Sequence, residues 1–292
     1  MKVRSNLFAL ASVLFLAPFV GAATDAANTG KAVPAADTAT TGQKFDYIEQ
    51  NGQKFVNISS INSTAGNDEF MRNVQVVNGQ RQRLVALENL KKGAITDEFK
   101  TAADAEIAAL TKRLDEDNRK MAETYGYSIS RDYIHVPVVT LIYLKLTDEE
   151  YAKAKDDPEV KEGDLLVREN DKYRLIAKIP TAEENQIFRR NVQVMQARRE
   201  NVVRMAKALE SMSAGEQKDE VQANYDKESK QLEEDNKKMV EKYGFSLARD
   251  YLMEIEVSKL YAKVTEEEFL KAEAQAKLNG SSDTTPAAPS AK

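Results

Sequence analysis

The strongest constraint on the fold of this chain is an internal repeat with a constant offset of 118 residues. The five residues Arg72–Val76 recur word for word as Arg190–Val194. Residues 112–133 and 230–251 agree at fourteen of twenty-two aligned positions, far more often than unrelated segments do. A repeat of this strictness indicates a tandem duplication, so we expect the same order of helices and strands in both copies.

The repeat divides the chain into two units with short flanks. The matching segments extend from about 43 to 160 and from about 161 to 277. The segment 23–42 is rich in Ala, Thr and Gly, and the segment 278–292 is rich in Ser, Thr, Pro and Ala. Such compositions supply too few large apolar side chains for a packed core. We therefore predict a disordered linker before the repeats and a disordered tail after them.

Residues 1–22 have the three-part layout of a secretory signal peptide. Two basic residues lie near the start, the apolar run Leu7–Val20 follows, and small residues around Ala22 and Ala23 precede a polar stretch. We predict cleavage after Ala22 or Ala23 and export of the remaining chain. The alternative is an uncleaved membrane anchor, but the apolar run is shorter than the ~20 residues of a spanning helix.

Composition bounds where the exported protein can work. The chain has no cysteine and so forms no disulfides, which suits a bacterial periplasm or cell surface better than a eukaryotic secretory route. Its 42 Lys and Arg residues stand against 47 Asp and Glu residues. A chain with this acidic balance has no general attraction for nucleic acid or anionic lipid. We expect a soluble exported protein that neither spans a membrane nor binds nucleic acid.

Each repeat begins with a predicted β-hairpin. Residues 45–60 contain two β-prone runs on either side of Asn51-Gly52. This dipeptide is the favoured pair of a type I′ turn, because both positions need a positive φ. In the second repeat Asn170-Asp171 takes this place between two further β-prone runs. The same hairpin is therefore expected twice.

Two long helices are expected after each hairpin. The first runs from about 67 to 92 and from about 184 to 212, and the second from about 96 to 124 and from about 216 to 242. Apolar residues recur along them at three- and four-residue spacing, which is typical of one buried helix face. In the first helix of the second repeat, the face comprises Phe188, Val192, Met195, Val202, Met205, Leu209 and Met212. In the second helix it comprises Ile107, Leu110, Leu114, Met121 and Tyr125 in the first repeat, and Tyr225, Leu232, Met239 and Tyr243 in the second.

The narrow apolar face predicts that the two helices of a repeat pair as an antiparallel coiled-coil hairpin. The turns fall near Gly93 and Gly215, while Gly126 and Gly244 end the second helices at the usual C-terminal glycine position. At a rise of 1.5 Å per residue each arm is ~40 Å long. The pair should therefore protrude well beyond a small sheet.

A strand and a short closing helix complete the repeat. Residues 133–146 are rich in Val, Ile, Thr and Tyr, and Pro137 argues for an edge or bulged strand. Helical spacing also fits the equivalent run 251–257. Because Pro137 disfavours a helix in the first repeat, we predict a strand in both repeats. Thr147–Glu150 and Thr265–Glu268 then have the pattern of a capping box. The predicted fold class is α+β, with two repeats that each carry a helical hairpin on a small antiparallel β base.

The copies differ most at the tips of the helical hairpins. Residues 86–111 and 204–229 agree at only three of twenty-six positions, whereas the segments at the base are nearly copied. Helices must meet the sheet at the base, so geometry restricts the residues there, while the tips protrude into solvent. We expect agreement at the base to serve structure and the tips to be free to differ.

Polar residues shared by the copies lie in the predicted seam between the helices. A turn near residue 94 would place position 72 level with about 117. Polar pairs in such a seam set the register of the helices, although a carboxylate cluster that binds a cation is the alternative. The expected pairs are Arg72 or Asn73 with Asp117 or Asn118, and Arg190 or Asn191 with Asp235 or Asn236.

The sequence nominates no catalytic, cofactor-binding or metal-ligating residue. Arg131-Asp132 and Arg249-Asp250 are expected to form ion pairs at the helix-to-strand turn. His135 is the only histidine and Met253 stands at the equivalent position, which excludes multi-histidine metal sites and histidine-based triads. Glycine-rich phosphate loops are also absent from the sequence. The 47 acidic residues offer many carboxylate pairs, and nothing marks one above another.

These observations favour a non-enzymatic cell-envelope protein whose helical hairpins serve protein–protein contact or self-association. The layout is similar to that of Skp-type periplasmic chaperones, which makes a holdase for unfolded envelope proteins one alternative. Skp-type proteins are basic and have a single unit, whereas this chain is acidic and duplicated, so we assign it to no family. A carboxylate-dependent hydrolase or a binding module for a small ligand is the second alternative.

Overall fold

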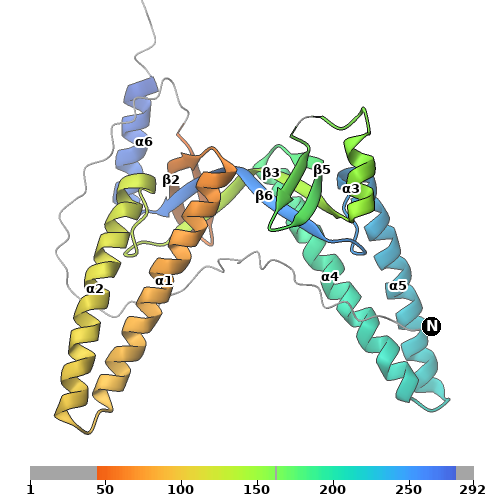
Figure 1. The fold of residues 1–292 in the computed structure, drawn as a ribbon, viewed down its shortest axis with the longest axis horizontal. Helices are drawn as coiled ribbons and strands as arrows, with labels where there is room; N and C mark the ends of the chain where they lie inside the picture. The colour runs from red at the N-terminus through yellow and green to blue at the C-terminus, as the bar shows by residue number, and fades with distance from the viewer. Residues whose placement is uncertain (1–44, 162, 281–292) are drawn as a thin grey trace, which may run out of the picture. The chain divides into compact units, whose positions relative to one another are not determined.

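The computed structural model describes residues 45–161 and 163–280. The predicted signal peptide and linker, and the part of the predicted tail beyond residue 280, lie outside these residues. The described part is a mixed α+β structure (Figure 1). In chain order its elements are β1 (Tyr47–Gln50), β2 (Gln53–Ile61), α1 (Thr64–Lys92), α2 (Asp97–Tyr125), β3 (Tyr133–Leu146), α3 (Asp148–Lys155), β4 (Leu165–Arg168), β5 (Asp171–Ile179), α4 (Ala182–Ser211), α5 (Glu216–Tyr243), β6 (Tyr251–Lys263) and α6 (Glu266–Gly280).

The order of elements is the same in the first half of the chain, residues 43–160, and in the second half, residues 161–277. Two strands, two long helices, a long strand and a further helix occur twice. The long helices contain 29, 29, 30 and 28 residues. The last helix, α6, ends at Gly280, beyond the predicted limit of the second repeat.

Both β-hairpin turns have positive φ at two successive residues. In the first turn these are Asn51 at 52° and Gly52 at 72°, so the predicted pair is confirmed. In the second turn they are Glu169 at 52° and Asn170 at 73°. The predicted pair Asn170-Asp171 was wrong by one residue, because Asp171 already belongs to β5, where it pairs with Arg168.

The second long helix of each half ends at the predicted glycine. Gly126 and Gly244 have φ values of 70° and 64°, and their N–H groups donate to carbonyls of the last helical turn. A Cβ atom at Gly126 would lie 3.2 Å from Ile58 Cδ1, and one at Gly244 would lie 3.2 Å from Ile176 Cδ1. Both positions favour glycine for two reasons: the backbone is left-handed, and the side chain of a neighbouring strand leaves little room for a Cβ atom.

The strands form one sheet in the order β1-β2-β6-β3-β5-β4. The sequence predicted an edge or a bulged strand for β3, and the structure shows the second alternative, since β3 is bulged and the edges are β1 and β4. The ladder between β3 and β5 begins at Thr140 and has a bulge between Ile142 and Tyr143. Pro137 precedes this ladder, so its missing N–H leaves no bond between β3 and β5 unmade.

The compact units of the structure are not contiguous in sequence. Within the described residues, unit A comprises 45–61, 68–136 and 259–280, and unit B comprises 62–67, 137–161 and 163–258. The strands β3 and β6 each pass from one unit to the other along their length. As a result, α2 and most of α1 share a unit with the end of β6, whereas α4 and α5 share a unit with most of β3.

The hydrophobic core of unit A is built mainly from the first helical hairpin. Phe70 of α1 meets Tyr125 of α2 edge to face, with 5.1 Å between ring centroids. The core is completed by Leu260 of β6, which is 1% exposed. Its other buried members are Ile61, Val74, Val77, Leu114, Met121 and Tyr127.

The core of unit B is built in the same way, from the helices of the second half and the long strand of the first half. Phe188 of α4 meets Tyr243 of α5 at 5.0 Å between ring centroids. Ile142 of β3 completes this core and is fully buried. Its other buried members are Ile179, Met195, Met239 and Phe245. Each half of the chain thus contributes its long strand to the core that covers the helices of the other half, a reciprocal strand exchange.

Candidate functional site: the two helical hairpins

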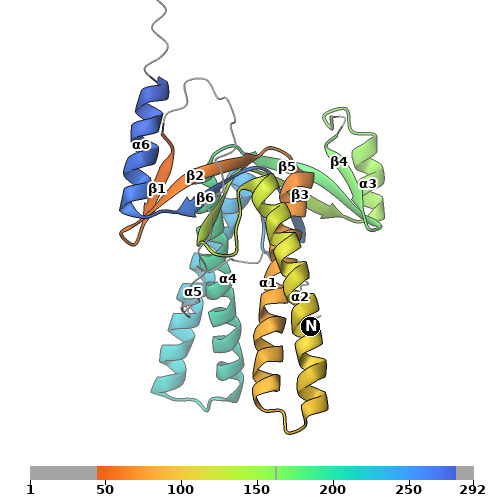
Figure 2. The same ribbon diagram turned by 90° about the vertical axis from the view of Figure 1, so that its left-hand side faces the viewer.

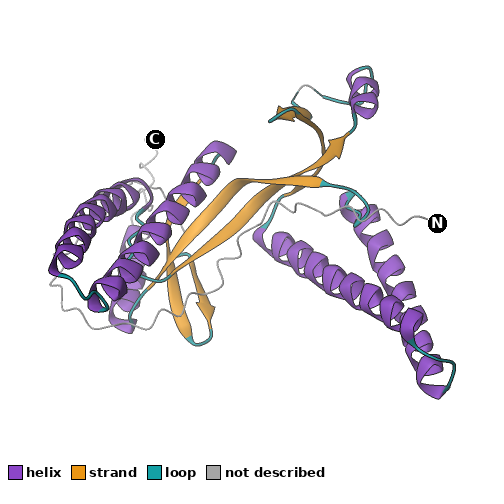
Figure 3. Cartoon of the chain, turned by 60° about the horizontal axis from the view of Figure 1, so that its bottom comes forward, coloured by secondary structure: helices purple, strands orange, loops and turns teal. Residues whose placement is uncertain are grey.

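In each unit the two long helices lie side by side and are joined by a short turn, with the strands of the unit at the opposite end (Figures 1 and 3). In the first hairpin, Thr96 caps α2 by accepting from the Phe99 N–H. In the second, Thr181 caps α4 by accepting from the Glu184 N–H. Only the part of each hairpin near the sheet carries fully buried aromatic residues. The distal part exposes most of its surface.

The seam of the first hairpin contains a polar pair in a different register from the prediction. Gln80 Nε2 donates to Asp117 Oδ2 at 2.7 Å, while Arg72 is exposed. The expected pairing of Asp117 with Arg72 or Asn73 was therefore wrong by about two helical turns. The contact of Phe70 with Tyr125 departs in the same direction, so the helices are offset along each other and are not level about residue 94.

The second hairpin has an ionic cluster at the equivalent place. Arg198 Nε contacts Glu228 Oε2 at 2.9 Å, and Arg198 also pairs with Asp235. Gln231 donates to the same Asp235 at 3.0 Å. The expected partner of Asp235, Arg190 or its neighbour in sequence, was wrong for the same reason as in the first hairpin. Both seams hold a carboxylate, but only the second opposes it with a cation.

The shared asparagines hold the chain where it leaves the second helix. Asn118 Oδ1 accepts from the Ile129 N–H at 2.8 Å, and Asn236 Oδ1 accepts from the Leu247 N–H at 2.9 Å. Their predicted place in the seam opposite Arg72 or Arg190 was therefore also wrong. A side-chain acceptor is used here because the loop that follows the helix has backbone donors left without a helical partner.

The shared tyrosines fasten the same loop. Tyr133 accepts from the Ser128 N–H at 2.7 Å, and Tyr251 accepts from the Ser246 N–H at 2.8 Å. Each hydroxyl also donates to the carbonyl of the glycine that ends the helix, at 3.3 Å. Burial raises the pKa of Tyr133 and Tyr251, so both remain neutral donors at physiological pH. These residues agree between the halves because they build the same turn.

The shared arginines contact the helix that follows the exchanged strand. Arg131 pairs with Glu268 at 2.7 Å, and Arg249 pairs with Glu150 at 3.0 Å. Each glutamate belongs to the other half of the chain from its arginine. Both arginines form ion pairs, as expected, but their partners lie in the exchanged segment and not in the turn itself. Asp132 takes part too, because Lys263 Nζ approaches its carboxylate at 3.3 Å.

The same glutamates complete capping boxes, as predicted. The Thr147 N–H donates to Glu150 at 2.9 Å, and the Thr265 N–H donates to Glu268 at 2.9 Å. These backbone hydrogen bonds, assisted by the neighbouring arginines, lower the pKa of Glu150 and Glu268. Figure 2 shows the two capped helices beside the strands of their own units, α6 by β1 and β2 and α3 by β4 and β5.

One arginine in the second hairpin is desolvated. Burial lowers the pKa of the half-buried Arg189 guanidinium. Among the residues that the structure describes, no carboxylate or hydrogen-bond acceptor contacts it. At the equivalent position the first hairpin carries Met71, which packs against the core of unit A. The half-buried cation therefore occupies a site that suits an apolar side chain.

The candidate chemical groups are dispersed. His135 lies 5.3 Å from Phe70, centroid to centroid, at the margin of the core of unit A. Within residues 45–161 and 163–280, no three His, Cys, Asp or Glu side chains are placed to hold one metal ion. Asp117 and Asp235, the acids of the alternative cation site, instead have the amide and guanidinium partners described above.

The tips of the two hairpins differ in polarity at equivalent positions. The first tip exposes Leu90, Ile95 and Phe99, which are 58%, 97% and 50% exposed. The second tip has Ala208, Ser213 and Gln217 at the positions 118 residues later. An almost fully exposed isoleucine at the end of an arm is unusual on a soluble surface, since each exposed apolar side chain lacks the burial that stabilises it.

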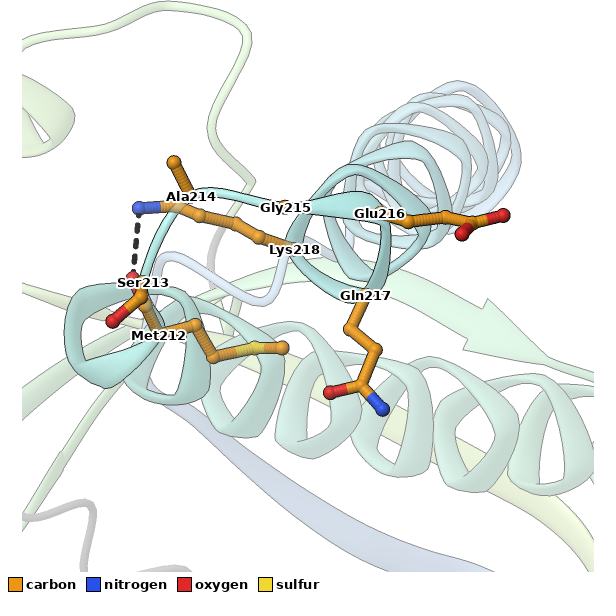
Figure 4. Close-up of a pocket in the computed structure, with 7 residues that line it drawn as sticks. All are labelled: Met212, Ser213, Ala214, Gly215, Glu216, Gln217 and Lys218. Carbon is orange, nitrogen blue, oxygen red and sulfur yellow. Dashed lines mark hydrogen bonds between the residues drawn. The ribbon is translucent and has the colours of Figure 1, made fainter.

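At the second tip, a side chain forms a hydrogen bond with the backbone of the connecting turn. Lys218 Nζ donates to the Met212 carbonyl at 3.2 Å, as Figure 4 shows. Residues 212–218 surround an open surface hollow of about 380 Å³. A second hollow, of about 200 Å³, lies along the first hairpin and is lined by Arg83, Glu106 and Leu110 together with their neighbours. Neither hollow collects acids in the manner of a hydrolytic site.

Comparison with models of known protein families, with curated proteins and with solved structures gives no match. None of the helices between residues 45 and 280 that the structure describes has the length and apolar character needed to cross a membrane. The geometry of the chain itself is therefore the basis for a functional proposal.

Sequence reasoning missed two features of these hairpins. The apolar tip has a signal in the sequence, because the constant offset sets Ile95 against Ser213 and Phe99 against Gln217. The strand exchange had no signal of its own. Ile142 and Leu260 are apolar and equivalent, and each would suit either core.

Proposed function

We propose that this chain is a non-enzymatic exported cell-envelope protein that arose by tandem duplication and uses two coiled-coil hairpins as binding arms. The single observation that carries the proposal is the contrast along each arm. Several residues near the sheet agree between the halves and have structural partners, whereas most residues at the tips differ and face solvent.

The contacts at the base support this division of labour. The shared side chains Asn118, Tyr133 and Arg131, with their counterparts in the second half, are all occupied in holding the turn or the exchanged segment. Other shared polar residues, such as Arg72 and Gln75, are exposed on the helix surface. The surface that remains for recognition is the distal half of each hairpin.

The partner class follows from the form of the arms. Each hairpin presents a long convex surface with a small hollow and no deep pocket, which suits a protein partner or another copy better than a small molecule. The charged, narrow distal helices would give contacts of modest area. Binding through both arms of one chain would then raise the overall affinity well above that of either arm alone.

The test is an exchange of tips that preserves length and helical register. Residues 88–100 are replaced by the sequence of 206–218, or the reverse, and a photo-crosslinking residue is placed at Lys92 or Glu216. Crosslinked products in the envelope should follow the tip sequence and not the arm that carries it. The same crosslinker at the exposed Ser60 of β2 is the matched control.

A contrary result has a definite form. If the exchanged tips capture the same products as the native protein, while Asp117→Asn abolishes a measurable activity, the arms are not the binding elements. A site that depends on carboxylates near the base would then replace the proposal.

A further inference from the structure

The tip of the first hairpin has an apolar end that the second hairpin lacks. Leu90 lies in the last turn of α1, Ile95 in the connecting turn and Phe99 in the first turn of α2. All three are at least half exposed, and Ile95 is 97% exposed. The core cluster of unit A lies at the other end of these helices, and near the tip the buried apolar residue is the small Ala103.

We propose that this apolar tip docks on the surface of a lipid bilayer, with Leu90, Ile95 and Phe99 inserted among the headgroups and upper acyl chains. The proposal goes beyond the protein contacts proposed above. It assigns membrane attachment to the first arm and leaves the polar second tip free.

The exposed area favours lipid over a second protein. A phenylalanine buries about 150–250 Å², and Leu and Ile are smaller, so the three exposed fractions amount to at most roughly 400 Å². A stable protein–protein interface uses about 800 Å² on each partner. A narrow protruding end gains little more area against a flat protein or against another tip. A bilayer closes around the end and needs no complementary shape.

The charges around the tip indicate the kind of lipid. Lys91, Lys92 and Lys100 flank the apolar side chains, but the Lys91 amine pairs with Asp104 and the Lys100 amine pairs with Asp97. Together with Glu98, these carboxylates balance the positive charge of the three lysines. The balance points to zwitterionic headgroups, because strong attraction to anionic lipid would need an excess of lysine.

The constant offset supplies a matched pair of variants. In the first, Ile95→Ser and Phe99→Gln give the first tip the residues of the second. In the second, Ser213→Ile and Gln217→Phe give the second tip the residues of the first. All four positions are exposed, so the substitutions leave both cores untouched.

The experiment is flotation of the purified exported protein with phosphatidylcholine vesicles. We expect the native protein to float with the vesicles at both low and high salt. The Ile95→Ser/Phe99→Gln variant should lose about tenfold or more in partitioning. Adding Ser213→Ile/Gln217→Phe to that variant should restore flotation. Unchanged flotation of the first variant, or absence of flotation by the native protein, would overturn the proposal.

A second measurement locates the contact. The chain has no cysteine, so Gly93→Cys and the equivalent Ser211→Cys each carry one environment-sensitive dye. Vesicles should shift the emission to the blue at position 93 and leave that at position 211 unchanged. If the dye at 93 responds instead to protein concentration without vesicles, a second copy covers the tip and the lipid assignment is wrong. Tip-directed crosslinking is measured separately, so either proposal can fail alone.

Discussion

Ile142 and Leu260 hold equivalent places in the two hydrophobic cores, and each comes from the half of the chain whose own helices it does not cover. Both side chains are almost completely buried, at 0% and 1% exposure. The helices α1 and α2 therefore depend on a residue that lies far later in the chain, and α4 and α5 depend on one that precedes them both. This relationship allows the exchange to be tested by single substitutions.

Ile142→Ala should lower the free energy of unfolding by about 2–4 kcal/mol, because truncation leaves a cavity in a close-packed core. The loss should appear far from the substitution in sequence. In hydrogen exchange, amides of α4 and α5 should lose protection before those of α1 and α2. Leu260→Ala should give the reverse pattern. Loss of protection confined to the helices of the same half would contradict the strand exchange.

Leu114→Ala should also destabilise by about 2–4 kcal/mol, since Leu114 is 6% exposed in the core of unit A. Leu232→Ala should cost less, because Leu232 is only half-buried at the equivalent position. Substitution of Lys92 or Glu216 by Ala at the tips should change stability by less than ~0.5 kcal/mol. Chemical denaturation of the four variants measures these values. Equal effects at seam and tip would mean that the arms are not packed as described.

Stability should fall at acid pH partly through Glu150 and Glu268. The folded protein lowers the pKa of both side chains below the ordinary value of 4.5, so the folded state binds fewer protons than the unfolded state near that pH. Their contribution is complete above about pH 4.5 and is lost as the pH falls through the lowered values. The Glu150→Gln/Glu268→Gln variant should show a shallower loss of unfolding free energy between pH 5 and pH 3. An unchanged slope would remove these residues from the explanation.

Arg189→Met should stabilise the protein by about 0.5–2 kcal/mol, because it removes a desolvated cation and restores the side chain found at the equivalent position. The reverse substitution, Met71→Arg, should destabilise the first hairpin. Thermal and denaturant unfolding of the two variants provide the comparison. If Arg189→Met instead weakens the fold, the guanidinium has a stabilising role that burial alone does not reveal.

The exported form should begin at Ala23 or Thr24, because cleavage is expected after Ala22 or Ala23. N-terminal sequencing of protein recovered from the envelope or the medium is the measurement. Recovery of a chain that still begins with Met1 would refute the signal peptide and, with it, the proposed location.

Local structure was predictable wherever a residue dictates its own backbone. Gly126 and Gly244 end their helices at positive φ, and Asn51-Gly52 forms the expected turn, because few other residues adopt these conformations. Thr147 and Thr265 start their helices for an equally local reason, a side-chain oxygen within reach of a free N–H. The turn of the second β-hairpin was predicted one residue too late, at Asn170-Asp171, although the constant offset from Asn51-Gly52 places it at Glu169-Asn170.

Arrangements over longer distances were not predictable in the same way. The period of a strand identifies which face is buried but not which helices cover it, so Ile142 and Leu260 could not be assigned to a core. The seam register failed for a geometric reason. Matching Arg72 to Asp117 assumes that the helices are level about the turn, whereas the contacts of Gln80 with Asp117 and Phe70 with Tyr125 show that they are offset along each other.

The reciprocal exchange also limits how this chain can change through evolution. Deleting either half would open the core of the half that remains, since Leu260 or Ile142 would go with the lost segment. The two halves must therefore be inherited together, while an arm can gain or lose whole turns at its tip without disturbing the sheet. Evolution can thus change the length and the tip residues of one arm while the other arm stays unchanged.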